Sequence, residues 1–142
     1  MQSHKPDFTL LDHTADLGMT VRGADLKDLF EGAARSMMQV MVRGKPPEST
    51  RTKRLSVRGD DLADLMVRWL GEILYLFDGE KEVVVDVQIN SISKSRLDAD
   101  LRVVSFDPHL HEILCEIKAV TYHQIEVAKK AHRWEATIIF DM

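Results

Sequence analysis

A nine-residue string occurs twice in the first half of the chain. Residues 21–29 read VRGADLKDL, and thirty-six residues later, residues 57–65 read VRGDDLADL. Each copy has the pattern of a strand that ends at glycine and is followed by an aspartate. Asp25 or Asp61 can then accept hydrogen bonds from the free amides of a first helical turn. The repeat predicts a duplicated strand-helix unit, and two copies are too few for a solenoid.

Both units are expected to continue as amphipathic helices. Their apolar residues recur at intervals of three and four, which places them on one helical face. In the first helix these are Leu26, Leu29, Phe30, Ala33, Ala34, Met37, Met38 and Met41, and in the second Leu62, Leu65, Met66, Trp69, Leu70, Ile73, Leu74 and Phe77. Because the offset between the copies continues through both stripes, we expect the two helices to lie side by side.

The second half of the chain changes to a period of two, which is typical of half-buried strands. In this half the predicted strands are residues 83–89, 97–103, 113–127 and 133–140, and two shorter strands are predicted near the start of the chain, at 8–12 and 17–21. The expected fold class is α+β, with two amphipathic helices packed on one face of a mostly antiparallel sheet. We expect a single domain over residues 1–142.

Composition favours a cytoplasmic globular protein. Hydrophobic residues make up 44% and charged residues 30% of the chain, which is ordinary for such proteins. No apolar run approaches the roughly 20 residues of a membrane span, and the first residues lack the apolar region of a signal peptide. Cys115 is the only cysteine, so an internal disulfide and a cysteine zinc cluster are excluded. We expect no membrane partner.

The net charge of −4 argues against tight, direct binding of nucleic acid. Recognition of phosphates normally requires a basic face. The basic cluster of this chain consists of Arg51, Lys53, Arg54 and Arg58. We interpret it as a solvated surface, with phosphate binding as the less favoured alternative.

Carboxylates occur near both ends of the sequence. Asp12, His13 and Asp16 fall within five residues, and Asp141 is followed by Met142. The residues alone leave two interpretations open. Either Asp16 bonds its own backbone in a turn and Asp141 belongs to a disordered acidic tail, or the two meet in the fold as hard oxygen donors of the kind that calcium and magnesium prefer.

Lysine and histidine residues add further candidates. Lys118 lies in an apolar stretch, where it is either a solvated strand position or a group that pairs with a carboxylate or phosphate. His109 and His111 could share a zinc ion with His123, although the flanking residues predict a loop. For His13 and His123 we favour structural hydrogen bonding over a ligand role. The chain contains no glycine-rich phosphate loop, nucleophile elbow or nucleotide-binding fingerprint.

Four motifs together resemble the archease family. They are HTADLG at 13–18, GADLKDLFEGAA at 23–34, IKAVTYH at 117–123 and FDM at 140–142, and they follow the family's order over nearly the whole chain. The resemblance implies a protein cofactor of the RtcB-type RNA ligase, which acts in tRNA splicing and RNA repair. Such a cofactor promotes guanylylation of the ligase and restores multiple turnover, and it is not itself an enzyme.

The resemblance also implies a set of site residues. The implied ligands of a divalent metal, expected to be calcium or magnesium, are Asp16, Asp141 and the backbone or terminal oxygens of Met142. Lys118 matches a functionally important lysine of the family. With His13 and His123 it is expected to face the partner.

Two other classes of function stay open at this point. One is a small divalent-metal-dependent hydrolase that uses the same carboxylates with His13 or His123 as base. The other, which the resemblance also allows, is a chaperone-like modulator of an RNA methyltransferase.

The chain departs from the family pattern at Ser105 and Phe106, where many relatives have Gly-Glu. The shape of the loop at 105–112 is therefore left open.

Overall fold

The structure, a computed structural model, describes residues 6–12 and 16–142. The helices in this part of the chain are α1 (Leu26–Met41) and α2 (Leu62–Glu80). The strands are β1 (Asp7–Asp12), β2 (Asp16–Gly23), β3 (Val42–Gly44), β4 (Arg51–Arg58), β5 (Glu82–Ile92), β6 (Arg96–Ser105), β7 (His111–Ile113), β8 (Ala119–Val120), β9 (Glu126–Lys130) and β10 (Arg133–Asp141). None of the described helices is long and apolar enough to cross a membrane.

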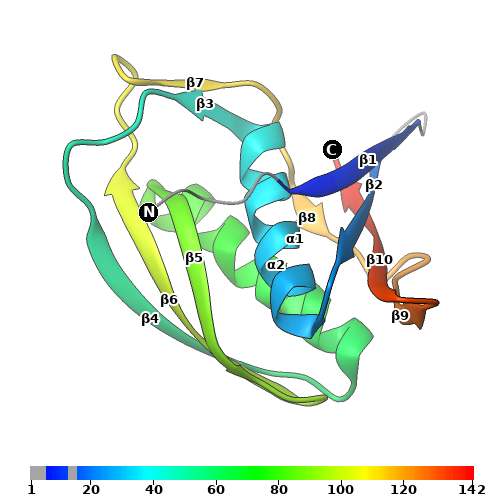
Figure 1. The fold of residues 1–142 in the computed structure, drawn as a ribbon. Helices are drawn as coiled ribbons and strands as arrows, with labels where there is room; N and C mark the ends of the chain where they lie inside the picture. The colour runs from blue at the N-terminus through cyan, green and yellow to red at the C-terminus, as the bar shows by residue number, and fades with distance from the viewer. Residues whose placement is uncertain (1–5, 13–15) are drawn as a thin grey trace.

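The described strands form three antiparallel sheets. The largest has the order β1-β2-β10-β8, with β9 also pairing with β10, and the second has the order β4-β6-β5. A short ribbon joins β3 to β7. Helix α1 contacts both β5 and β2, and α2 contacts β5, β4 and β8. The two helices therefore lie between the two larger sheets, as Figure 1 shows.

This architecture confirms the predicted α+β class with two helices and antiparallel strands. What the alternating pattern did not indicate is that the strands are divided between sheets on both sides of the helices. A period of two shows which residues of a strand face the core, but it carries no information on which strands pair.

The duplicated unit of the sequence is a duplicated unit of structure. A Cβ atom on Gly23 would lie 2.5 Å from the backbone nitrogen of Leu29, and one on Gly59 would lie 2.7 Å from that of Leu65. The end of each strand therefore passes so close to the first turn of the following helix that only glycine fits.

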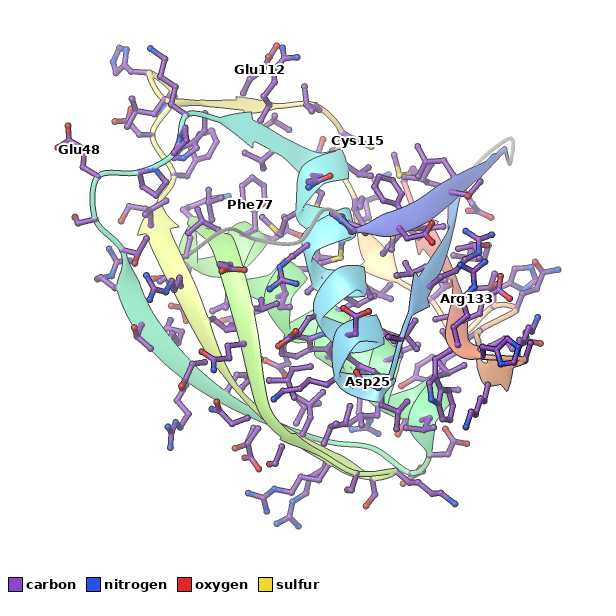
Figure 2. All side chains as sticks on the ribbon, in the orientation of Figure 1. Asp25, Glu48, Phe77, Glu112, Cys115 and Arg133 are labelled. Carbon is purple, nitrogen blue, oxygen red and sulfur yellow. The ribbon has the colours of Figure 1, made fainter. Side chains whose placement is uncertain are left out.

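Both helices begin with the same reciprocal cap. Asp25 accepts a hydrogen bond from the Asp28 amide at 2.8 Å, and the Asp28 carboxylate accepts one from Ala24 at 2.9 Å. Asp61 and Asp64 repeat this arrangement at the start of α2. Two amides of each helix start are satisfied in this way, which stabilises the first turn. Asp25 is visible at the beginning of α1 in Figure 2.

The predicted apolar stripes form the core between the sheets. Trp69 of α2 is fully buried, and its indole nitrogen donates a hydrogen bond of 2.8 Å to the carbonyl oxygen of Phe30 in α1. This bond satisfies the polar atom of the tryptophan and fixes the two helices to one another. The expectation that they lie side by side is confirmed.

The predicted strand at 113–127 is wrong as one continuous element. It is divided into the end of β7, the two residues of β8 and the start of β9. The reason is that its hydrogen-bond partners change along the chain. The amides of Leu114 and Cys115 donate to the carbonyl oxygen of Met41 at the end of α1, whereas the amide of Lys118 donates to Asp141 in β10. A segment that crosses between sheets cannot form one ladder.

Candidate functional site

Asp16 and Asp141 lie directly opposite one another in the largest sheet. Strand β2 pairs with β10 over its whole length, and Asp141 is the Cα partner of Asp16 at the end of that ladder. Directly opposed residues of an antiparallel pair project to the same face, with Cβ atoms about 4.5–5.5 Å apart. The two carboxylates, distant in sequence, are thus brought together by strand register.

The core side of β10 determines which way these carboxylates face. Ala136, Ile138 and Phe140 are fully buried against the helices. Side chains alternate along a strand, so Asp141 belongs to the opposite face, and it is exposed. Asp16 is half-buried. The pair is therefore accessible to a ligand or partner from outside the molecule.

Lys118 reaches the same end of the sheet from the other side of β10. Its amide donates a hydrogen bond of 2.8 Å to the carbonyl oxygen of Asp141, and the following residue, Ala119, pairs with Asp141 in register. The Lys118 side chain is exposed. Strands β2, β10 and β8 thus place two carboxylates and a lysine at one end of three neighbouring strands.

Met142 is held close to this end by a sulfur contact. Its thioether sulfur lies 3.9 Å from Cys115 Sγ, which can donate a weak hydrogen bond to it. Burial raises the pKa of the Cys115 thiol, which keeps the proton on that donor. Cys115 lies beside the end of α1 (Figure 2). In the sequence it stood out only as a lone cysteine, and nothing there indicated this contact.

The segment between β8 and β9 carries His123. The amide and the hydroxyl of Thr121 both donate to the carbonyl oxygen of Ile139 in β10, at 3.0 and 2.9 Å. The amide of His123 in turn donates to Thr121 Oγ1 at 3.2 Å, and the histidine side chain is exposed. Lys118 and His123 therefore lie on one segment fixed to β10. His13 lies outside the described residues.

A contact that no sequence pattern predicts joins this segment to the second repeat. The Tyr122 hydroxyl donates a hydrogen bond of 2.6 Å to Asp64, the same carboxylate that caps α2 and accepts from Arg68 Nε at 2.9 Å. The bond from Tyr122 is the main cause that lowers the pKa of Asp64, and in return it raises the pKa of Tyr122. In the sequence, membership of the IKAVTYH motif is the one feature that points to Tyr122.

The zinc site considered for the three histidines is not formed. The Nδ1 atom of His111 accepts a hydrogen bond from the Asp107 amide at 3.0 Å, and its ring stacks on Phe106 with centroids 5.6 Å apart. Within residues 6–12 and 16–142, no three His, Cys, Asp or Glu side chains are grouped as metal ligands. The site predicted at Asp16, Asp141 and Met142 uses two carboxylates and main-chain oxygens, so it stays a prediction.

The fold and the opposed carboxylates define a small α+β protein whose candidate site joins segments from the beginning and the end of the sequence. A family model described as the Archease protein family (MTH1598/TM1083) matches residues 8–142. The chain belongs to this family.

Three similar proteins each cover 95–100% of this chain. Protein archease of Methanosarcina acetivorans is 32% identical over 146 residues, which covers 100% of both chains. The solution structure of Methanobacterium thermoautotrophicum protein 1598 has a TM-score of 0.78 at 28% identity and covers 95% of this chain and 98% of that one. The crystal structure of an archease from Thermotoga maritima, described as a possible chaperone, has a TM-score of 0.63 at 18% identity over 100% and 99% of the chains, and it supports the fold alone.

Proposed function

We propose that the protein activates an RtcB-type RNA ligase in tRNA splicing and RNA repair. In this proposal it promotes guanylylation of the ligase and so sustains multiple turnover, without being an enzyme itself. Family membership supports the proposal. The observation that carries it is the register of β2 and β10, which places Asp16 opposite Asp141 and leaves Asp141 exposed to a partner.

The residues at this end of the sheet fit a divalent cation. Two carboxylates on one face, with main-chain oxygens of Met142 beside them, are hard donors of the kind that calcium and magnesium take. Without a cation, two like charges directly opposed on a sheet repel. A cation held there would supply a positive charge able to bridge to a phosphate or carboxylate group. Asp16 and Asp141 would hold it, and the strand ladder would keep them oriented.

Lys118 is proposed to face the ligase. Its backbone is fixed by the hydrogen bond to Asp141, while its side chain is exposed. A flexible ammonium on a fixed backbone suits contact with a phosphate or carboxylate of a partner. His123 follows on the same segment and presents an exposed imidazole. An activator of this kind acts through its protein partner, so it needs no extended basic face of its own.

The proposal is tested by measuring RNA ligation with purified ligase under multiple-turnover conditions. We expect Asp16→Asn and Asp141→Asn to lower the stimulated turnover about tenfold or more, because each removes one charged ligand. Asp78→Asn, an exposed aspartate of α2, is the control and should stimulate like the native protein. Ligase that is guanylylated beforehand should join one round of RNA normally with every variant. Full stimulation by Asp141→Asn would contradict the proposal.

Two further measurements separate this function from the alternatives. The isolated protein is incubated with phosphoesters and Mg²⁺, Mn²⁺ or Zn²⁺, and hydrolysis that depends on Asp16 and Asp141 would favour a metal-dependent hydrolase instead. A pull-down from the native lysate should recover the ligase. Recovery of an RNA methyltransferase in its place would favour the chaperone-like role.

A further inference from the structure

The four basic residues of β4 differ in how they are neutralised. Three of them pair with carboxylates, and these ion pairs are Arg51–Glu82 at 2.6 Å, Lys53–Glu82 at 2.6 Å, Lys53–Glu80 at 3.2 Å and Arg54–Asp100 at 3.2 Å. The fourth, Arg58, has no carboxylate within ion-pair distance among the described residues. Carboxylates of the same sheet or of the end of α2 therefore neutralise three of the four basic residues, and Arg58 is the exception.

Arg58 instead lies opposite another arginine. It is the last residue of β4, and its Cα partner is Arg96, the first residue of β6. Like charges directly opposite on a sheet destabilise it, because their side chains share one face. Arg96 also contacts Asp98, at 3.3 Å, two residues further along β6. Within the described part of the chain, the Asp98 carboxylate pairs with Arg96 alone, so the two opposed arginines keep a net positive charge.

Both arginines line a hollow with a volume of about 410 Å³. Its other lining residues are Gly59, Asp60, Arg68 and Ser95. Arg68 comes from α2 and is held through its Nε atom by Asp64 at 2.9 Å. At the start of α2 the Asp64 amide donates to Asp61, and the Asp60 amide before the helix donates to Asp64. The positive charge of the hollow is that of its arginine side chains.

We propose that this hollow binds a ribonucleotide unit of single-stranded RNA. Guanidinium groups donate paired hydrogen bonds to phosphate oxygens, which would also relieve the repulsion between Arg58 and Arg96. The Asp60 carboxylate can accept a hydrogen bond from a ribose 2′-hydroxyl, a group that DNA lacks. The volume lies within the range of small-ligand sites, about 300–1,000 Å³. The hollow belongs to α2 and to the sheet of β4 and β6, so the inference is independent of the proposed ligase activation.

The binding is expected to be weak and sensitive to salt. The phosphate contacts come from a few arginines on a protein of net charge −4, and such contacts are weakened by added salt through counterion release. This agrees with the prediction that the protein does not bind nucleic acid tightly.

The inference is tested with a labelled single-stranded RNA of about ten nucleotides, a length within the usual site sizes. Fluorescence anisotropy is measured with the full chain at several salt concentrations. We expect Arg58→Ala to weaken RNA binding about tenfold and to reduce the salt slope by about one. Arg54→Ala is the matched control, since it removes the same charge from the same strand at a residue paired with Asp100. It should change the affinity less than about twofold.

DNA of the same sequence and inorganic pyrophosphate distinguish the sources of the phosphate. The native protein should bind the RNA more tightly than the DNA, and Asp60→Asn should remove this preference. In a titration of the ¹⁵N-labelled native protein, the amide signals of Gly59 and Ser95 should shift on addition of RNA. This measurement does not depend on the stability of any variant.

Several results would overturn the inference. These are equal losses of RNA affinity in Arg58→Ala and Arg54→Ala, undisturbed Gly59 and Ser95 signals at saturating RNA, or binding of pyrophosphate without binding of RNA. Loss of ligase binding in Arg58→Ala together with undetectable RNA binding would show that the hollow recognises a protein instead.

Discussion

At the scale of single residues, the most informative side chain is Asp64. It caps the first turn of α2, accepts from Arg68, and receives the hydroxyl of Tyr122 at 2.6 Å. Tyr122 is itself 56% exposed, and its hydroxyl provides a hydrogen bond to α2. One carboxylate therefore connects the second repeat to the segment that carries Lys118 and His123.

Replacing Tyr122 by phenylalanine tests this connection. Since the hydrogen bond from Tyr122 is the largest cause of the lowered pKa of Asp64, Tyr122→Phe should raise that pKa towards its ordinary value. The measurement is an NMR titration of the Asp64 carboxyl carbon. Tyr75→Phe, at an exposed tyrosine of α2, is the control and should leave the titration unchanged. An unchanged Asp64 titration in Tyr122→Phe would show that the bond does not form in solution.

The two glycines of the repeat make a second prediction at this scale. A methyl group on Gly23 would contact the backbone of Leu29 at 2.5 Å, and a helix backbone cannot move aside without disturbing its first turn. Gly23→Ala should lower the free energy of unfolding by about 1–3 kcal/mol. In contrast, nothing lies within 4 Å of a Cβ on Gly71 in α2. Gly71→Ala should therefore stabilise the protein by about 0.5–1 kcal/mol.

Urea unfolding of both variants gives the comparison directly. Each variant adds one methyl group to one glycine, so the effect on the entropy of the unfolded chain is the same in both. Opposite changes in the free energy of unfolding then report whether the folded protein has room for the methyl group. If Gly23→Ala were as stable as Gly71→Ala, the close approach of strand and helix would not exist as described.

At the scale of elements, Glu82 connects two strands that are not neighbours. It begins β5 and accepts from Arg51 and Lys53 of β4, both at 2.6 Å, across the intervening β6. The hydrogen bond from Lys53 is the main cause that lowers the pKa of Glu82 below its ordinary 4.5, followed by that from Arg51. The side chain of Glu82 is only 11% exposed.

The pH dependence of stability follows from the lowered pKa of Glu82. The unfolded chain binds a proton to Glu82 more readily than the folded chain does. The contribution of Glu82 is therefore complete above about pH 4.5 and is lost as the pH falls through the lower folded pKa. Urea unfolding between about pH 6 and pH 3 should show this loss, and Glu82→Gln should flatten the curve.

Other lowered carboxyl pKa values, at Asp64, Asp98 and Asp100, will leave some slope in that variant. Glu48→Gln is the control, because Glu48 is exposed in the loop before β4 (Figure 2). It should reproduce the native pH curve. If the stability of Glu82→Gln fell with pH as steeply as that of the native protein, the contacts of Glu82 with Arg51 and Lys53 would contribute nothing to the acid sensitivity.

The helices were the elements that sequence could predict most fully. Apolar spacing located both, and the aspartate pairs located their starts, because caps and stripes depend on neighbours in the chain. The ribbon of β3 and β7 and the division of 113–127 were missed, because they depend on which distant carbonyl accepts each amide. Met41, for example, accepts from Leu114 and Cys115, and no local pattern in either segment indicates that.

The candidate site likewise has residues that the sequence named and a contact that it did not indicate. The sequence and the family resemblance named Asp16, Asp141 and Lys118 as candidates, and the structure places all three at one end of neighbouring strands. Tyr122 and Asp64 were not connected in advance. Their hydrogen bond joins residues 58 positions apart, and each residue has an adequate local explanation without the other.

At the scale of the whole molecule, the opposed carboxylates couple a local site to global unfolding. Asp16 and Asp141 meet only because β2 and β10 pair, so the unfolded chain does not keep them together. A cation that both ligate would bind the native state alone and stabilise it, by about 2.7 kcal/mol at a hundred times its dissociation constant. Thermal unfolding in Ca²⁺ or Mg²⁺, compared with a chelator, should therefore show a higher midpoint with the cation.

Asp141→Asn separates this effect from general effects of salt. The substitution removes the repulsion between two like charges on one face of the sheet, so the variant should unfold at a higher temperature than the native protein in the chelator. It should also lose the response to the cation, whereas Asp78→Asn should keep it. If Asp141→Asn still gained stability from Ca²⁺ and Mg²⁺ as the native protein does, the cation would be binding elsewhere. The register of β2 and β10 would then serve the fold alone.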